Sequence, residues 1–252
     1  MMITFTPGTN REFITSSAPP KRMKLSVIIP VYNEENSLPR ILPMVQQAPL
    51  PPGVGQEIVI VDDGSTDATP NILEGFRSDQ HVKILRHDRN RGKTAAVLTG
   101  LRAAAGDIFL IQDADLEYHP SHYPRLLEPI LRDKASVVYG SRFKGRILGM
   151  RPVNRWANRV SNITFNLLYG TRITDINTCF KVFTRDAFRD MDITTSHFGL
   201  DTELTAKLVR RGYAITEVPI DYAARSVEEG KKITWIKAVS MYAGIFRFRF
   251  GR

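Results

Sequence analysis

The chain of 252 residues has one cysteine, Cys179, and five histidines. A single thiol forms no internal disulfide and excludes a metal site built from several cysteines. The histidines show no metal-ligand spacing, so we interpret them as structural or surface residues. Cys179 reads as a small core residue, and this cysteine usage favours a reducing cytoplasm.

Long apolar runs are also missing. No window reaches the run of about 18 apolar residues that a membrane-spanning helix requires. Nothing near the N-terminus has the basic-then-apolar pattern of a secretory signal. With 42% hydrophobic and 24% charged residues, the composition is that of an ordinary globular protein. We therefore expect a cytoplasmic protein whose membrane contact is peripheral.

From Lys24 onward, short runs rich in Val and Ile alternate with amphipathic segments of helical length. The predicted strands are KLSVIIPVY, EIVIVDD, VKILRHD, DIFLIQD and ASVVYGS; the predicted helices are Asn36–Gln47, Asp67–Arg77, Lys93–Ala105 and Ser121–Lys134. This alternation predicts an α/β fold with a mostly parallel sheet and helices on both faces. Ligands bind such sheets beyond the carboxyl ends of the strands.

The second half of the chain is less regular. It predicts helices at Asn154–Tyr169, Leu200–Arg211 and Ile233–Phe250, and strands at Thr178–Phe183 and Ala214–Tyr222. We expect three parts: a flexible N-terminal tail (1–23), one catalytic domain (24–232) and a C-terminal amphipathic helix (233–252).

The first two strands end in polar side chains. A dinucleotide-binding fold would place G-x-G-x-x-G after the first strand. This chain has PVYNEEN there instead, which counts against NAD or FAD. Tyr32 is able to stack on a base, and Glu34 to accept hydrogen bonds from a sugar or base. The second strand ends in VDDGSTD, where Asp62 is placed to accept from the nitrogens of a base.

The fourth strand ends in two aspartates, Asp113 and Asp115, with one residue between them. Alternate residues of an extended segment point the same way, so both carboxylates face one point beyond the sheet. Their oxygens suit Mg²⁺ or Mn²⁺, and Glu117 could add a third ligand. A second D-x-D, Asp190 and Asp192, follows no apolar strand, and we expect no chemistry there.

Taken together, PVYNEEN, VDDGSTD, NRGKTAAVLTGLRAAAGD, DADLEYHP and GSR resemble the family-2 inverting glycosyltransferases, which have the GT-A nucleotide-sugar-binding (Rossmann-like) fold. The later stretches TDINTCFKVF, FGLDTELTAKLVRRGY, EVPIDY and AARSVEEGKKI are similar to the dolichol-phosphate mannosyltransferase branch and its bacterial polyprenyl-phosphate relatives. The resemblance runs from Lys24 to about Ile233.

This resemblance implies roles for particular residues. The donor, GDP-mannose or UDP-glucose, would be bound by Pro30, Tyr32, Glu34, Asp62, Lys93 and Asp113. The divalent ion would be bound by Asp113, Asp115 and Glu117. The catalytic set would be Asp115, Arg142, Arg225, Lys231 and Asp201, with the three cationic side chains holding the phosphates of donor and acceptor. Asp201 and Glu203 would lie near the sugar or order the loop that carries Arg225.

The acceptor is where the alternatives diverge. A sugar hydroxyl needs a general base to attack, whereas a phosphate monoester is already ionised near neutral pH. The chain lacks the QxxRW-type motif of processive relatives, which favours a polyprenyl phosphate acceptor. A saccharide or protein hydroxyl acceptor, with Asp201 or Glu203 as base, is the alternative. A basic nucleic-acid-binding protein is a third reading, disfavoured because acids at the strand ends would repel a phosphate backbone.

The net charge of +9 is concentrated in two stretches. Residues 141–159 and 230–252 each carry six basic residues and no acid. Two segments, Arg151–Tyr169 and the tail ITWIKAVSMYAGIFRFRFGR, mix Trp, Phe and Ile with Arg and Lys, a composition typical of helices that lie in a membrane interface. Packing of their apolar faces on the sheet is the equally open alternative.

Overall fold

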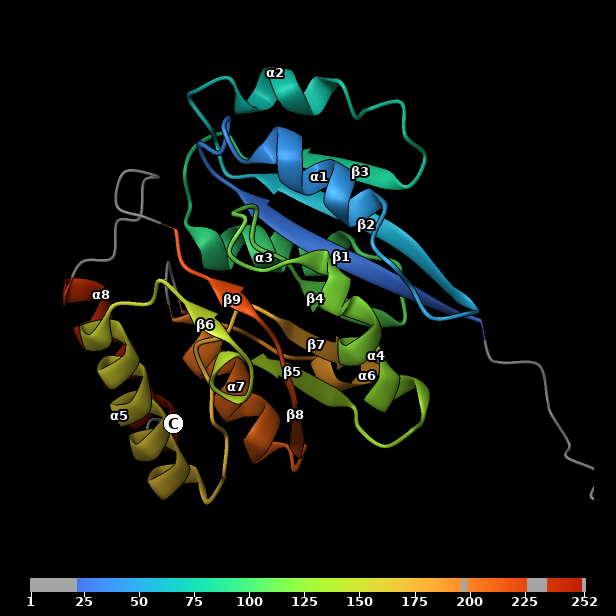
Figure 1. Ribbon diagram of the computed structural model, residues 1–252. Coiled ribbons are helices and arrows are strands. Elements are labelled where there is room, and N and C mark those ends of the chain that lie inside the picture. The colour runs from blue at the N-terminus through green and yellow to red at the C-terminus, as the bar shows by residue number, and fades with distance from the viewer. Residues whose placement is uncertain (1–21, 196–198, 226–234, 251–252) are drawn as a thin grey trace, which may run out of the picture.

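The computed structural model describes residues 22–195, 199–225 and 235–250 (Figure 1). Lys231 and the first residues of the predicted C-terminal helix lie outside them, as does most of the predicted N-terminal tail. The helices are α1 (Leu38–Gln46), α2 (Thr69–Glu74), α3 (Lys93–Ala103), α4 (Tyr123–Leu131), α5 (Pro152–Tyr169), α6 (Arg185–Phe188), α7 (Leu200–Arg210) and α8 (Trp235–Phe250). Short 3₁₀ turns cover Pro120–His122 and Arg142–Lys144.

The central sheet has seven strands in the order β3-β2-β1-β4-β7-β5-β8. Their bounds are β1 (Met23–Val31), β2 (Val54–Asp62), β3 (Val82–Arg86), β4 (Ile108–Ile111), β5 (Val137–Ser141), β7 (Lys181–Thr184) and β8 (Ile215–Pro219). Only β7 is antiparallel to its neighbours, β4 and β5. The predicted mostly parallel α/β sheet is therefore confirmed. A separate parallel pair joins β6 (Ile147–Leu148) to β9 (Tyr222–Ala223).

Two strands of the sheet, β4 and β5, are buried along their whole length. Strands covered on both faces read as continuous apolar runs, which explains the IFLI and SVVYG stretches. Figure 1 shows α1 and α4 in front of this sheet and α3 behind it. Because β1, β2, β3 and β4 are parallel to one another, their carboxyl ends share one edge of the sheet, as predicted.

The antiparallel strand brings a new part of the chain to that edge. Because β7 runs against β4, its first residues lie beside the end of β4: Val182 pairs with Leu110. Cys179, just before β7, is buried as predicted, and burial raises the pKa of its thiol. The second half of the chain thus reaches the strand ends of the first half.

Helices α5, α7 and α8 form a second layer beside the sheet. Figure 1 shows α5 next to α8. Their shared core consists of Phe165, Ile173, Ile176, Ala206 and Ile245. Helix α5 begins with Pro152 in its first turn and ends at Gly170 in the left-handed conformation (φ 68°), which are the usual start and stop residues of a helix.

Candidate functional site

The loops that follow β1 and β2 are linked to each other by hydrogen bonds. The backbone N–H of Asn33 donates to Ser65 Oγ at 2.9 Å, and that of Glu34 donates to Thr69 Oγ1 at 2.9 Å. Asn33 itself has a left-handed backbone (φ 53°), a conformation that asparagine tolerates well. Tyr32, predicted to stack on a base, is 44% exposed beside this junction.

Asp62 is buried at the end of β2 with only one of its oxygens hydrogen-bonded. Its Oδ1 accepts from the backbone N–H of Ser65 at 2.8 Å. Its Oδ2 is buried without a hydrogen-bond partner. The Nε of Arg86 lies 3.2 Å from Oδ2, near enough for charge attraction, but its N–H is not aimed at the oxygen. A buried acceptor of this kind suits an N–H group of a base, the role predicted for Asp62.

Asp63 has a different task, because its oxygens hold the loop before α3. They accept from the backbone N–H groups of Arg91 (2.9 Å) and Gly92 (2.7 Å), and one lies 2.6 Å from His87 Nδ1. A Cβ on Gly64 (φ +73°) would lie 2.5 Å from the backbone of Arg89, so only glycine fits at this turn.

The two aspartates after β4 each meet a cation. Asp113 Oδ1 lies 2.6 Å from Lys93 Nζ, at the start of α3. Asp115 Oδ2 accepts from Arg225 Nη2 at 3.0 Å. The same guanidinium contacts both oxygens of Glu34, at 3.2 and 3.3 Å. The structure thus brings together four predicted residues from three distant segments (Glu34, Asp113, Asp115 and Arg225). Lys93, also predicted, lies beside them.

The electrostatics of these side chains reflect crowding of negative charge. Burial raises the pKa of Asp115 to about 7, with the charges of Asp113 and Glu117 adding to the effect and Arg225 opposing it. Burial also raises the pKa of Asp113, but the Lys93 ammonium outweighs it and the net shift is downward. Lys93 is correspondingly held in its charged form, with its pKa raised by Asp113 against the effect of burial. A further cation at this place would relieve the crowding.

Glu117 departs from its predicted role as a metal ligand. Its Oε1 accepts from the backbone N–H of Arg225 at 2.9 Å, and its Oε2 accepts from the hydroxyl of Tyr222 at 2.8 Å. Within the described ranges, no three acidic, His or Cys side chains are placed to hold one ion together. The predicted three-carboxylate ligand set is therefore not formed, because Glu117 anchors the segment that carries Arg225.

Asp113 and Asp115 nevertheless fit a divalent ion. They supply hard oxygen ligands at a crowded, partly buried position. Mg²⁺ and its analogues are commonly bound through one or two carboxylates, with phosphate oxygens and water as the other ligands. Two carboxylates therefore suffice if a diphosphate is bound at the same time.

Arg142 is expected from the resemblance to hold phosphate, but in the structure it is paired with a carboxylate. It is 6% exposed. Its Nε and Nη2 donate to the two oxygens of Asp175, each at 2.7 Å, and its guanidinium lies 5.1 Å from the centre of the Tyr222 ring. This bidentate pair uses the donors that a phosphate would need. Arg142 therefore orders the segment after β5, and its GSR motif alone did not reveal the buried partner.

Asp201 is joined to a lysine that the sequence did not single out. Lys181 Nζ is fully buried and lies 2.6 Å from Asp201 Oδ1. It also donates to the carbonyl of Ile176 at 3.0 Å and lies 4.9 Å from the centre of the Tyr139 ring. A lysine inside the apolar run CFKVF was the available signal, because a buried ammonium requires a partner. Asp201 is thereby held at the β7 end, close enough to Lys93 to contribute to the raised pKa of that lysine.

Glu203 does not order the loop of Arg225. Its oxygens accept from the backbone N–H groups of Thr194 (2.9 Å) and Thr195 (2.7 Å), and one lies 2.6 Å from Lys207 Nζ. It is thus committed to the segment before α7. The second D-x-D, as predicted, is exposed: Asp190 and Asp192 lie in the turn after α6.

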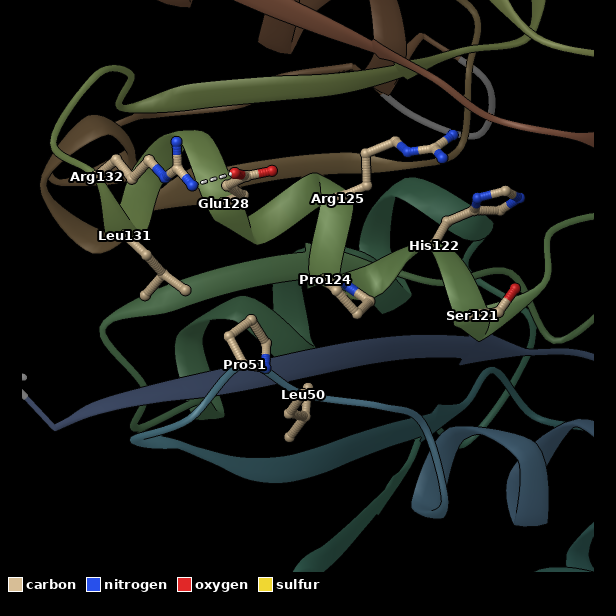
Figure 2. A pocket seen from close by; sticks show the side chains of 9 residues that line it. All are labelled: Leu50, Pro51, Ser121, His122, Pro124, Arg125, Glu128, Leu131 and Arg132. Carbon is tan, nitrogen blue, oxygen red and sulfur yellow. Dashed lines mark ion pairs between the residues drawn. The ribbon is translucent and has the colours of Figure 1, made fainter.

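A groove on the front of the sheet is a different feature. It has a volume of about 560 Å³ and lies between α4 and the loop after α1, lined by Leu50, Pro51 and one side of α4 (Figure 2). Its polar groups are already engaged: Arg125 donates to the carbonyl of Pro219 at 3.0 Å, and Arg132 pairs with Glu128 at 2.8 Å. No predicted site residue lines it.

Helix α5 exposes an apolar stripe to solvent. Val153 is 66% exposed, Trp156 68%, Ile163 59% and Leu167 80%. Their spacing of three, seven and four residues places them on one side of the helix. The opposite side, with Phe165, packs in the core. Packing on the sheet, the alternative for this stripe, is therefore excluded. Within the residues that the structure describes, no helix is long and apolar enough to span a membrane.

Comparisons with known proteins identify the family of this chain. The model of "Glycosyl transferase family 2" matches residues 26–192. A dolichol-phosphate mannosyltransferase from Pyrococcus furiosus is 30% identical over 83% of this chain and 59% of its own length. An undecaprenyl-phosphate 4-deoxy-4-formamido-L-arabinose transferase from Pseudomonas fluorescens is 30% identical over 82% of this chain and 60% of its own. The chain thus spans about 60% of the length of these curated relatives.

Solved structures show the same fold. Glucosyl-3-phosphoglycerate synthase from Mycobacterium tuberculosis superposes with a TM-score of 0.70 at 20% identity, covering 90% of this chain and 80% of the other. Another structure of that enzyme, with a TM-score of 0.67 at 21% identity and the same two coverages, contains Mn²⁺ and uridine diphosphate. The family match covers well over half of the chain. On this evidence the chain belongs to glycosyl transferase family 2.

Proposed function

We propose that this protein transfers a hexose from a nucleotide-sugar to a polyprenyl phosphate, with inversion at the anomeric carbon. The observation that carries the proposal is the arrangement at the strand ends. A buried acceptor on Asp62 lies at the same sheet edge as Asp113 and Asp115. One side recognises a base, and the other side neutralises phosphate charge.

The donor is GDP-mannose or UDP-glucose. Pro30, Tyr32 and Asp62 form the base side of the pocket, and Lys93 and Asp113 lie on the phosphate and ribose side. Mg²⁺ or Mn²⁺ is held by Asp113 and Asp115, and when bound it supplies positive charge to the departing diphosphate. Lys93 keeps Asp113 ionised and oriented. Arg225, which pairs with Asp115, is proposed to bind the same phosphates.

The proposed acceptor rests on the reactivity of a phosphate monoester and on the relatives, whose names give dolichol phosphate and undecaprenyl phosphate. A phosphate monoester is ionised near neutral pH, so its oxygen attacks the anomeric carbon without a general base. Arg225 and Lys231 are proposed to hold it. The Asp201 carboxylate is bound to Lys181, and in this proposal it positions the sugar.

The direct test supplies the protein with labelled nucleotide-sugars, Mg²⁺ or Mn²⁺, and a polyprenyl phosphate. A labelled product that extracts into organic solvent and is cleaved by mild acid is expected. Label transferred only to a saccharide or peptide hydroxyl would instead establish the alternative acceptor, with Asp201 as base. Salt-sensitive nucleic-acid binding without any transfer would contradict both proposals.

The acceptor lipid stays in a bilayer, so the protein must reach a membrane surface. We place this contact on the exposed stripe of α5, together with Phe246 and Phe250 of α8. Arg155 and Arg159 flank the stripe and are exposed, which favours anionic headgroups. The proposed location is the cytoplasmic face of the membrane, peripherally bound.

Vesicle sedimentation tests this surface. Wild-type protein is expected to bind vesicles containing anionic lipid, less at high salt, and Trp156→Ser with Leu167→Ser is expected to abolish binding. Arg77→Gln, which changes an exposed arginine shortly after α2, serves as control. If the stripe variant binds vesicles as well as wild type, the stripe is not the membrane surface. If wild type instead forms salt-independent dimers that the stripe variant does not form, the stripe is a surface for self-association.

A further inference from the structure

Arg225 lies among the carboxylates where the divalent ion is expected. Its guanidinium joins Asp115 at 3.0 Å to both oxygens of Glu34 at 3.2 and 3.3 Å. Glu34 and Arg225 are 191 residues apart in the chain, so this is a purely tertiary contact. The guanidinium of Arg225 thus links two acids that follow different strands.

The backbone of Arg225 is held independently of its side chain. Glu117 accepts from the N–H of Arg225 at 2.9 Å and from the hydroxyl of Tyr222 at 2.8 Å. The side chain is therefore able to change partners while its Cα stays at the edge of the site. Glu117, predicted as a metal ligand, acquires a different task as the anchor of this arginine.

The present set of partners leaves the guanidinium incompletely satisfied. The Nε of Arg225 is buried and has no hydrogen-bond partner. A buried donor in this state costs free energy. A guanidinium offers five N–H donors in a flat fork that matches the oxygens of a phosphate group. A diphosphate would thus be a better partner for Arg225 than the two carboxylates are.

We propose that Arg225 is an internal counter-ion that occupies the place of the divalent ion, and that it moves to the diphosphate when ion and donor enter together. The inference rests on the proposed function for the identity of the anion. Its consequence is that the ion and the nucleoside diphosphate bind with positive coupling. The ion alone must compete with Arg225 for Asp115, whereas the diphosphate draws Arg225 away. By linkage, the ion strengthens nucleotide binding by the same factor.

The test measures Mn²⁺ binding directly, from the electron paramagnetic resonance signal of free Mn²⁺, with and without UDP or GDP. Wild-type protein is expected to bind Mn²⁺ weakly alone and about tenfold or more tightly with the matching nucleotide, within the usual range of such couplings. Arg225→Gln is expected to bind Mn²⁺ alone about tenfold more tightly than wild type, with a smaller further gain from nucleotide, because only the phosphate ligands of the ion then contribute to the coupling. Arg77→Gln is the matched control and should behave as wild type.

The opposite result is equally clear. If Arg225→Gln binds Mn²⁺ alone no better than wild type, Arg225 does not compete with the ion and the inference is wrong. Arg225→Lys, which keeps the charge, gives a second reading: weak binding of Mn²⁺ alone is expected, and tight binding would contradict the competition. Failure of every nucleoside diphosphate to bind would overturn the proposed function, while the arm with Mn²⁺ alone still decides the competition.

Discussion

Asp62 ends β2 and Asp63 comes directly after it, whereas Asp113 and Asp115 follow β4 with one residue between them. Adjacent residues of an extended chain point in opposite directions, and alternate residues point the same way. The first pair is divided: Asp63 holds the loop before α3, and Asp62 has one oxygen without a hydrogen bond, 3.2 Å from Arg86 Nε. The second pair shares one place, and each member has a cationic partner.

The comparison separates carboxylates that hold the backbone from carboxylates that can meet a ligand. A carboxylate whose oxygens are filled by backbone N–H groups stabilises a loop and is unavailable to a ligand. Carboxylates that face each other repel, which contributes to the raised pKa of Asp115 at about 7, and they attract any cation that can approach.

Asp115→Asn should reduce transfer of sugar to lipid by at least about 100-fold, because it removes charge that holds the ion at the departing diphosphate. The rate is measured with labelled nucleotide-sugar and polyprenyl phosphate. Asp192→Asn, in the exposed second D-x-D, is the matched control and should retain wild-type turnover. A near-normal rate for the Asp115 variant would remove this residue from the ion site.

Asp63→Asn should lower the free energy of unfolding by about 3 kcal/mol, because the amide nitrogen cannot accept from the buried N–H groups that the carboxylate now serves. Urea denaturation at neutral pH measures the change. Asp62→Asn is expected to cost less than about 1 kcal/mol, since one amide oxygen still accepts from Ser65. Equal losses for the two variants would show that the pair is not divided.

Glu203 is another buried acid whose oxygens are filled, and pH offers a test of it. Burial raises its pKa, but the bonds from Lys207, Thr194 and Thr195 outweigh it, so the folded pKa lies below the ordinary value of 4.5. An acid with a depressed pKa stabilises the fold above its unfolded pKa, and this stabilisation is lost as the pH falls through the folded pKa.

Glu203→Gln should therefore cost about 2 kcal/mol of unfolding free energy at pH 7. The difference from wild type should shrink progressively below pH 4.5, where the native carboxylate takes up a proton. Denaturant unfolding of both proteins across this pH range measures the effect. A difference that stays constant with pH would show that the charge of Glu203 does not contribute.

Asp62→Asn should weaken binding of the nucleoside diphosphate by about tenfold, or 1.4 kcal/mol, because the amide presents a donor where an acceptor is needed. Calorimetry with UDP and with GDP measures the affinity and identifies the base. Glu74→Gln, an exposed acid on α2, is the control. Unchanged affinity for both nucleotides would place the base elsewhere.

Local pattern explains why much of this was predictable. Buried parallel strands leave continuous apolar runs, so their ends and the acids that follow them are visible in the chain: Asp62, Asp113 and Asp115 were all found this way. The exposed second D-x-D was also recognised, because no apolar strand leads into it. Lys181 was missed although it interrupts an apolar strand, since its partner Asp201 is 20 residues away in the chain.

Residue type and spacing along the chain account for the alternation of strands and helices, the sheet edge that carries the acids, and the family resemblance. Which charges meet depends on the folded arrangement. Arg142 is buried against Asp175, Glu117 turns to the segment of Arg225, and Arg225 joins Glu34 to Asp115. The physical reason is that an ion pair depends on distance in space, and the antiparallel β7 and the short β9 bring segments together that no local pattern connects.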